Sequence, residues 1–113
     1  MANVTRGRDI ATESGAAVNM VSRGFGLLGR STLPEGAGLI IRPCNSVITF
    51  FMRFPIDVLF VDAHGQVVHL IHALRPWRTS KMVRGSKYVV ELPAGVLRAT
   101  ETALGDAIEI VPA

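Results

Sequence analysis

The chain has 113 residues, of which 49% are hydrophobic and 19% charged, and its net charge is +3. A disordered chain would be less hydrophobic, and a collagen-like or low-complexity chain would need more than the 11 glycines and 6 prolines present. We therefore expect one folded domain, residues 1–113. The longest apolar run, Val47 to Val61, is interrupted by polar residues and falls short of the roughly 18 residues of a membrane span. Since the opening residues show no secretory signal, we expect a cytoplasmic protein.

The first half of the chain predicts one helix and several short strands. Residues 1–11 fit an edge strand. Between positions 15 and 28 the apolar side chains follow the spacing of an amphipathic helix, which is the main helix we expect. A turn at residues 33–36 separates this helix from two apolar, strand-like runs at residues 38–41 and 47–52.

A β-hairpin is predicted at about 56–74. Its two arms flank Asp62-Ala63-His64-Gly65, where glycine supplies the positive φ that tight hairpins need. Beyond it we predict an exposed loop, a strand, a short helical segment and a last strand, at residues 77–86, 88–92, 93–102 and 107–111. This order indicates an α+β fold: a mostly antiparallel sheet, curved or barrel-like, packed on the one main helix.

Arg53 and Asp57 are the only charged residues between Arg42 and Asp62. A buried charge needs a partner, so two interpretations stay open. Arg53 binds an anion that Asp57 orients, or the two are structural, as a buried pair or with Asp57 accepting backbone N–H groups. An adjacent arginine keeps a carboxylate ionised and weakly basic, which favours binding over base catalysis.

Cys44 is the only cysteine, so no intrachain disulfide forms. It acts as a nucleophile only where a base lowers the pKa of its thiol, and no Cys–His signature surrounds it; a small buried hydrophobe is the alternative. His69 and His72 lie three residues apart, which on a strand places them on opposite faces. We therefore expect one half-buried and one surface histidine, no metal site and no cofactor.

No acidic residue lies between Asp62 and Glu91, and basic residues recur there at every third position beside Trp77. They are Arg75, Arg78, Lys81, Arg84 and Lys87. Such a segment suits a phosphate backbone, with the tryptophan stacking on a base. Because a spacing of three gives neither one helical stripe nor one strand face, we expect a solvated loop instead.

Several motifs occur in a fixed order along the chain. They are Gly26-Leu27-Leu28-Gly29-Arg30, the run Thr49 to Asp62 with Phe-Met-Arg-Phe-Pro-Ile-Asp inside it, Glu91-Leu92-Pro93-Ala94-Gly95, and Gly105-Asp106. Their order and spacing, roughly from Gly24 to Ile110, resemble the domain of unknown function 192 family of bacteria and archaea. The resemblance implies a compact domain with a curved sheet and carries over no activity.

We predict a non-enzymatic domain that binds a small molecule or an anion. Its candidate site comprises Arg30, Thr49, Arg53, Asp57, Trp77 and Arg78. One alternative is a hydrolase-like enzyme that uses Asp57 and Cys44 in the same cleft. Another is a domain that docks a partner or a nucleic acid through the basic loop 75–87. We expect neither a nucleic-acid partner nor a membrane, and the oligomeric state is not predicted.

Overall fold

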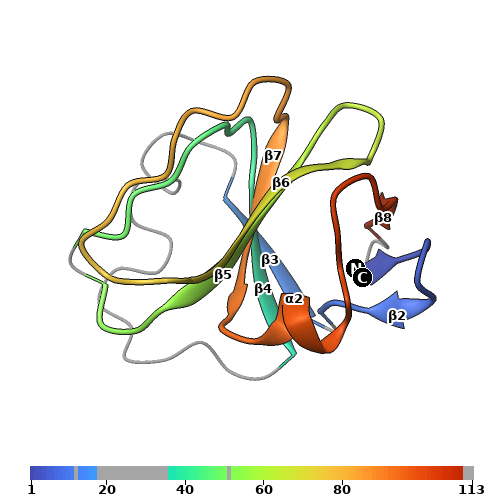
Figure 1. Ribbon diagram of the computed structural model, residues 1–113, viewed down its shortest axis with the longest axis horizontal. Helices are drawn as coiled ribbons and strands as arrows, with labels where there is room; N and C mark the ends of the chain where they lie inside the picture. Colours follow the sequence, from blue (N-terminus) through green and yellow to red (C-terminus); the bar gives the residue numbers. More distant parts are fainter. Residues whose placement is uncertain (12, 18–35, 51, 111–113) are drawn as a thin grey trace.

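The structure is a computed structural model that describes residues 1–11, 13–17, 36–50 and 52–110 (Figure 1). Among these residues the strands form two sheets, and one short helix lies beside them. In chain order the elements are β1 (Ala2–Asn3), β2 (Arg8–Asp9), β3 (Glu13–Ala17), β4 (Ala37–Ile41), β5 (Ile56–Val61), β6 (Val67–Leu74), β7 (Tyr88–Pro93), α2 (Val96–Ala99) and β8 (Ile108–Glu109). No helix among these residues has the length and apolar character needed to cross a bilayer.

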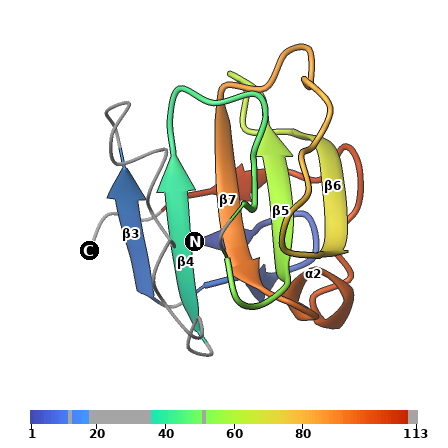
Figure 2. The same cartoon turned by 90° about the vertical axis from the view of Figure 1, so that its left-hand side faces the viewer.

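The larger sheet has five strands in the order β3-β4-β7-β5-β6, which Figure 2 shows side by side. β3 and β4 are parallel, and every other neighbouring pair is antiparallel, as expected for the sheet as a whole. The sheet is open, because within the described part of the chain β3 pairs only with β4 and β6 only with β5. The barrel-like closure that we expected is therefore wrong.

The predicted β-hairpin is confirmed as β5 and β6. One carboxylate oxygen of Asp62 accepts the backbone N–H groups of His64 and Gln66, both at 2.9 Å, which shapes the turn. Gly65 has a φ of 78°, and an added Cβ would lie 3.1 Å from the carbonyl oxygen of Ile108. Both conformation and space therefore require glycine at this position.

The predicted main helix at 15–28 is not confirmed. Its first residues lie in β3, which pairs in parallel register with β4; the remainder falls outside the described residues. The amphipathic spacing is a weak signal that tertiary strand pairing overrides. The helix that the structure does describe, α2, has four residues and lies within the predicted helical segment 93–102.

Two more local predictions change. Residues 1–11 form a small antiparallel pair, β1 and β2, that joins β8 in a second, three-stranded sheet rather than the edge of the main sheet. The predicted strand 47–52 is reduced to a single bridge between Ile48 and Thr79. Strands are confirmed at β4 and β7, and at β8 in shortened form.

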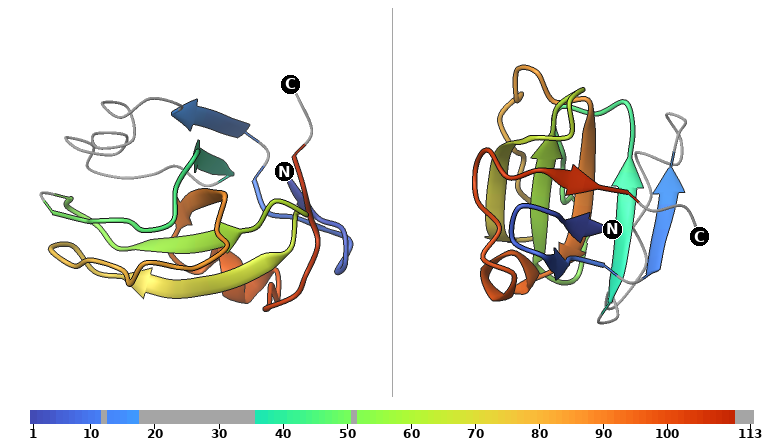
Figure 3. Two further views of the ribbon diagram at one scale, coloured as in Figure 1. Left: turned by 90° about the horizontal axis from the view of Figure 1, so that it is seen from above. Right: turned by 90° about the vertical axis from the view of Figure 1, so that its right-hand side faces the viewer.

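The main sheet buries both faces. One face lies against the three-stranded sheet and α2, as the right-hand view of Figure 3 shows, and the core between them includes Leu59, Val90, Leu92 and Leu97. The opposite face carries a second core that includes Val58, Phe60 and Val89. Because both faces are buried, the whole of β5 is buried along its six residues.

Two loops cover the second core: residues 42–55, of which 51 is not described, and residues 75–87. We call them the paired loops. They run side by side in Figure 1 and are joined by backbone hydrogen bonds of 2.7–2.9 Å. These bonds run from Trp77 N–H to Thr49 O, Thr49 N–H to Arg78 O, Ser80 N–H to Val47 O and Val83 N–H to Asn45 O. The pairing holds Val47 and Val83 down on the core, so residues 77–86 are not the wholly exposed loop that we expected.

On the face of the main sheet that carries α2, the Asp57 carboxylate joins three segments of the chain. Asp57 is fully buried on β5, and its Oδ1 accepts the N–H of Ala73 at 2.8 Å, where an irregularity in β6 holds Ala73 at a φ of 50°. Its Oδ2 accepts the N–H groups of Gly95 at 3.0 Å and Leu97 at 2.9 Å, at the start of α2. Gly95 adopts a φ of 100°, which turns this short segment toward the carboxylate.

We expect Asp57→Ala to lower the free energy of unfolding by about 3 kcal/mol or more, because three N–H groups lose a charged acceptor and two of them belong to one tight turn. Urea denaturation of both proteins measures the difference. The matched control is Asp9→Ala, which removes an exposed carboxylate from β2 and should change stability by less than about 0.5 kcal/mol. Equal midpoints for wild type and Asp57→Ala would contradict this assignment.

Candidate functional site

Arg53 and Asp57 do not form a pair. The Arg53 side chain is exposed, Asp57 is fully buried, and neither takes part in the ion pairs that the described residues form. Asp57 instead engages both carboxylate oxygens with backbone N–H groups. The structure therefore agrees with one of the interpretations that the sequence left open, in which Asp57 accepts backbone N–H groups.

Thr49 is fully buried and joins the paired loops. Its hydroxyl donates to the carbonyl oxygen of Arg75 at 2.6 Å and accepts the N–H of Arg78 at 2.9 Å. Both functions of the hydroxyl are therefore used within the protein. Trp77 and Arg78 take part in this bridge through their backbones, and their side chains are exposed: Trp77 is 54% exposed, with its ring 5.8 Å from that of Phe50.

The predicted site residues that the structure describes do not all lie together: Asp57 is buried beneath α2, whereas Thr49, Trp77 and Arg78 belong to the paired loops. Arg30 lies outside the described residues. Asp57 faces the core beneath α2, whereas Cys44 packs against the second core, on the other side of the sheet. The hydrolase-like alternative, which requires Asp57 and Cys44 in the same cleft, does not agree with this arrangement.

The two histidines of β6 behave as expected from strand geometry. His69 is half-buried, with its ring 5.4 Å from that of Phe60, and burial lowers its pKa. His72 is exposed. No group of three or more metal-ligating side chains occurs in the part of the chain that the structure describes.

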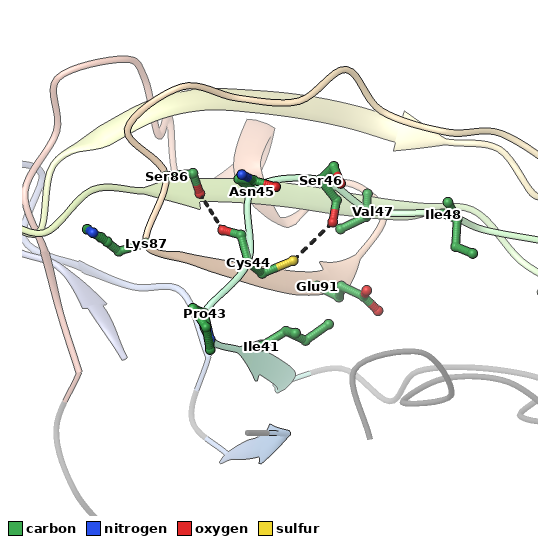
Figure 4. A pocket seen from close by; sticks show the side chains of 10 residues that line it. All are labelled: Ile41, Pro43, Cys44, Asn45, Ser46, Val47, Ile48, Ser86, Lys87 and Glu91. Atoms are coloured by element: carbon green, nitrogen blue, oxygen red, sulfur yellow. Dashed lines mark hydrogen bonds between the residues drawn. The ribbon is translucent and has the colours of Figure 1, made fainter. Parts of the chain in front are cut away.

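A cavity of about 560 Å³ lies where residues 43–48 pass over β4 and β7 (Figure 4). Apolar groups make one part of its wall and polar groups the rest. Its lining residues are Ile41, Pro43, Val47 and Ile48, together with Cys44, Asn45, Ser46, Ser86, Lys87 and Glu91. In Figure 4 the Glu91 carboxylate and the Cys44 thiol both point to the right of the view.

Glu91 is the unusual member of this wall. It is only 6% exposed, and its cross-strand neighbours are Leu39 on β4 and Val58 on β5. Its carboxylate makes no hydrogen bond or ion pair with any described residue, and burial raises its pKa to about 7. A buried carboxyl without a partner is costly for a protein to keep, which marks it as a candidate functional group.

Cys44 is held in place beside Glu91 by the paired loops. Its backbone N–H donates to the carbonyl oxygen of Lys87 at 3.1 Å, and its own carbonyl accepts the Ser86 hydroxyl at 2.9 Å. The thiol Sγ lies 3.0 Å from the carbonyl oxygen of Ser46, to which it donates. A thiol that donates to a carbonyl is stabilised in its protonated form, which makes it a poor nucleophile.

Sequence reasoning missed Glu91, although a signal was present. Glu91 is the single charged residue in the apolar strand Tyr88 to Pro93, just as Asp57 is the single charged residue of Ile56 to Val61. The test applied to Asp57, that a charge inside an apolar strand needs an explanation, selects Glu91 equally.

We expect the stability of this protein to fall as pH rises from about 4.5 to about 7, because folded Glu91 retains its proton over a range in which the unfolded chain releases it. The contribution of this group is about 3 kcal/mol, fully lost above pH 7. Glutamine does not titrate, so Glu91→Gln lacks this pH dependence. The free energy of unfolding of the variant, relative to that of wild type, should therefore be higher at pH 8 than at pH 5. Thermal melts at both pH values test this, with the exposed Glu109→Gln as control. A constant difference between Glu91→Gln and wild type would contradict it.

Comparison with known proteins places this architecture in a family. The chain is 37% identical over 114 residues to a UPF0127 protein from Pyrococcus furiosus, covering 96% of each chain. It is 35% identical over 98 residues to a UPF0127 protein from Pyrococcus abyssi, covering 82% of this chain and 81% of the relative. Both of these relatives come from archaea.

A crystal structure of a protein of unknown function from the bacterium Novosphingobium aromaticivorans has the same fold. It superimposes with a TM-score of 0.84 over 94% of this chain and 79% of that one, at 21% sequence identity. Residues 2–110 match the family DUF192, described as an uncharacterized ACR. The chain therefore belongs to the DUF192 family of uncharacterised proteins, as its motifs indicated.

Proposed function

We propose that this protein binds a small molecule in the cavity beside Glu91. The observation that carries the proposal is the buried Glu91 carboxylate, which lines the cavity and has no hydrogen-bond partner among the described residues. The ligand-binding function expected from the sequence is kept, and its site moves from the Arg53 region to the cavity. A volume of about 560 Å³ is within the usual range for small-molecule sites.

The chemistry of the wall selects a class of ligand. Ile41, Val47 and Ile48 accommodate an apolar body, while Glu91 offers a carboxyl that titrates near neutral pH. A ligand N–H or O–H group would supply the missing partner, and a cationic amine would also compensate the charge. An anion placed against Glu91 would be repelled. We therefore propose a small apolar molecule with an amine or another donor group, rather than the anion considered from the sequence.

A binding role fits this cavity better than catalysis. The thiol of Cys44 donates to a backbone carbonyl, and a protonated thiol is a weak nucleophile. Asp57, the base of the hydrolase-like alternative, accepts three backbone N–H groups on the other side of the sheet. The proposal therefore assigns no bond-making step to these residues.

A matched panel of benzylamine, benzyl alcohol and benzoate tests the ligand class. We expect benzylamine to raise the melting temperature by several degrees near saturation, benzyl alcohol by less and benzoate not at all. The benzylamine shift should increase from pH 6 to pH 8, because the Glu91 carboxyl ionises over this interval while the amine stays protonated. Differential scanning fluorimetry at both pH values is the measurement.

Two variants locate the site. Glu91→Gln keeps the shape of the side chain and should abolish the benzylamine shift, whereas Arg53→Ala removes an exposed side chain and should leave it unchanged. A shift that persists in Glu91→Gln but disappears in Arg53→Ala would return the site to the Arg53 region. No shift with any member of the panel would contradict the amine class.

Cys44 provides an independent report on the cavity. The half-exposed thiol should react with iodoacetamide no faster than a simple thiol, because it donates to the Ser46 carbonyl. Saturating benzylamine should slow this alkylation in wild type and have no effect on Glu91→Gln. Mass spectrometry of the intact protein follows the reaction. An alkylation rate that benzylamine leaves unchanged in wild type would show that the amine binds elsewhere.

A further inference from the structure

The paired loops concentrate positive charge without any compensating acid. Residues 42–55 and 75–87 contain seven basic residues and no aspartate or glutamate. These residues are Arg42, Arg53, Arg75, Arg78, Lys81, Arg84 and Lys87. All seven are exposed; the guanidinium of Arg42 lies 5.6 Å from the centre of the Tyr88 ring, and the other six belong to the two loops that are hydrogen-bonded side by side. Sequence reasoning considered only the five in 75–87, because Arg53 joins them only through the folding of the chain.

The same loops expose most of the large apolar side chains on the described surface. Of the six that are exposed there, four lie on the paired loops: Ile48, Phe50, Trp77 and Met82, at 58%, 41%, 54% and 74%. The other two, Val4 and Leu104, lie elsewhere. An apolar group with a charged surround is typical of an interaction surface, while single exposed apolar residues are not.

The fold holds this surface in a defined shape. The Thr49 bridge fixes Trp77 at a φ of 64°, a conformation unusual for a bulky residue, with its ring beside Phe50. The main chain on both sides is pinned by further bonds between the loops. Figures 1 and 3 show the paired loops running out together past the ends of β5 and β6. Trp77 and Phe50 are both exposed on these loops.

We propose that the paired loops dock this protein onto the surface of an anionic lipid bilayer. Trp77 and Phe50 lie at the level of the headgroups, Ile48 and Met82 contact the acyl boundary, and the basic residues face the lipid phosphates. The indole ring of tryptophan, which carries one N–H group, favours this interface, and clusters of four to eight basic residues bind anionic headgroups. We expected no membrane because the sequence has no apolar run long enough to span one. Docking on a bilayer surface does not require such a run.

A lipid surface accounts for these residues better than a nucleic acid does. Sequence-independent binding of single strands uses a basic groove in which aromatic rings stack on bases. Of the four exposed apolar side chains on the paired loops, only Phe50 and Trp77 are aromatic, and their ring centres lie 5.8 Å apart. Ile48 and Met82 have no flat face for stacking, but aliphatic side chains enter a bilayer readily.

The protein carries its own reporter for this contact, since Trp77 is its only tryptophan. The full chain is mixed with vesicles of equal parts phosphatidylcholine and phosphatidylglycerol, with pure phosphatidylcholine vesicles, and with a single-stranded oligonucleotide. We expect the Trp77 emission to shift to shorter wavelength, and the protein to sediment, only with the anionic vesicles. Raising the salt concentration should weaken this binding, because ions screen the attraction.

Matched variants separate the docking surface from the rest of the molecule. The double substitution Arg75→Gln and Arg78→Gln should weaken partitioning about tenfold or more, whereas Arg98→Gln on α2 should leave it unchanged. Met82→Ser should reduce binding, and Leu104→Ser, at a residue that is 65% exposed, should not. Phe50 is left intact, because changing it would alter the Trp77 emission directly.

Three results would overturn the proposal. The first is that anionic vesicles produce neither an emission shift nor sedimentation. The second is that Arg98→Gln weakens binding as much as the loop substitutions, which would indicate attraction by net charge alone. The third is that the oligonucleotide quenches Trp77 emission while the vesicles leave it unchanged, which would assign the surface to nucleic acid. Glu91→Gln should bind vesicles like wild type, so failure at this surface is distinguishable from failure at the cavity.

Discussion

The carboxylate of Asp57 is the interaction on which one side of the molecule depends. It is buried on a central strand and accepts backbone N–H groups from the end of β6 and the start of α2, so a single side chain fixes where three segments meet. A buried carboxylate must be satisfied, and here the backbone supplies every bond. Because α2 has only four residues, its position depends on this anchor and on the burial of Leu97 rather than on its own helical stability.

Glu91 shows what the same residue class does when its environment differs. Asp57 pairs in register with Leu92, and Glu91 with Val58, so the two acids lie on adjacent strands but on opposite faces of the sheet. Under α2, three amides converge on Asp57; beside the cavity, no described group reaches Glu91. The first carboxylate therefore stabilises the fold, while the second costs stability and is the group that we propose binds a ligand.

The paired loops link the two proposed activities. Their inner side chains, Val47 and Val83, complete the second core, and residues 43–48 form the wall of the cavity. Their outer side chains carry the basic and apolar groups of the proposed docking surface. Because the Thr49 bridge fixes the two loops to each other, the cavity wall and the outer surface belong to one hydrogen-bonded unit. A protein docked through this unit would hold its cavity close to the lipid surface.

By itself, the sequence determined the features that depend on neighbouring residues. Gly65 and Asp62 specify the hairpin turn, apolar β-branched runs specify β4, β5 and β7, and the motif order specifies the family. Only the tertiary structure decided the rest. The parallel pairing of β3 with β4 replaced a predicted helix start, and the meeting of Asp57 with three distant amides decided between the interpretations of Asp57 that the sequence left open. The face on which Glu91 lies, and the joining of two basic loops into one surface, likewise depend on contacts between residues far apart in the chain, which local patterns do not encode.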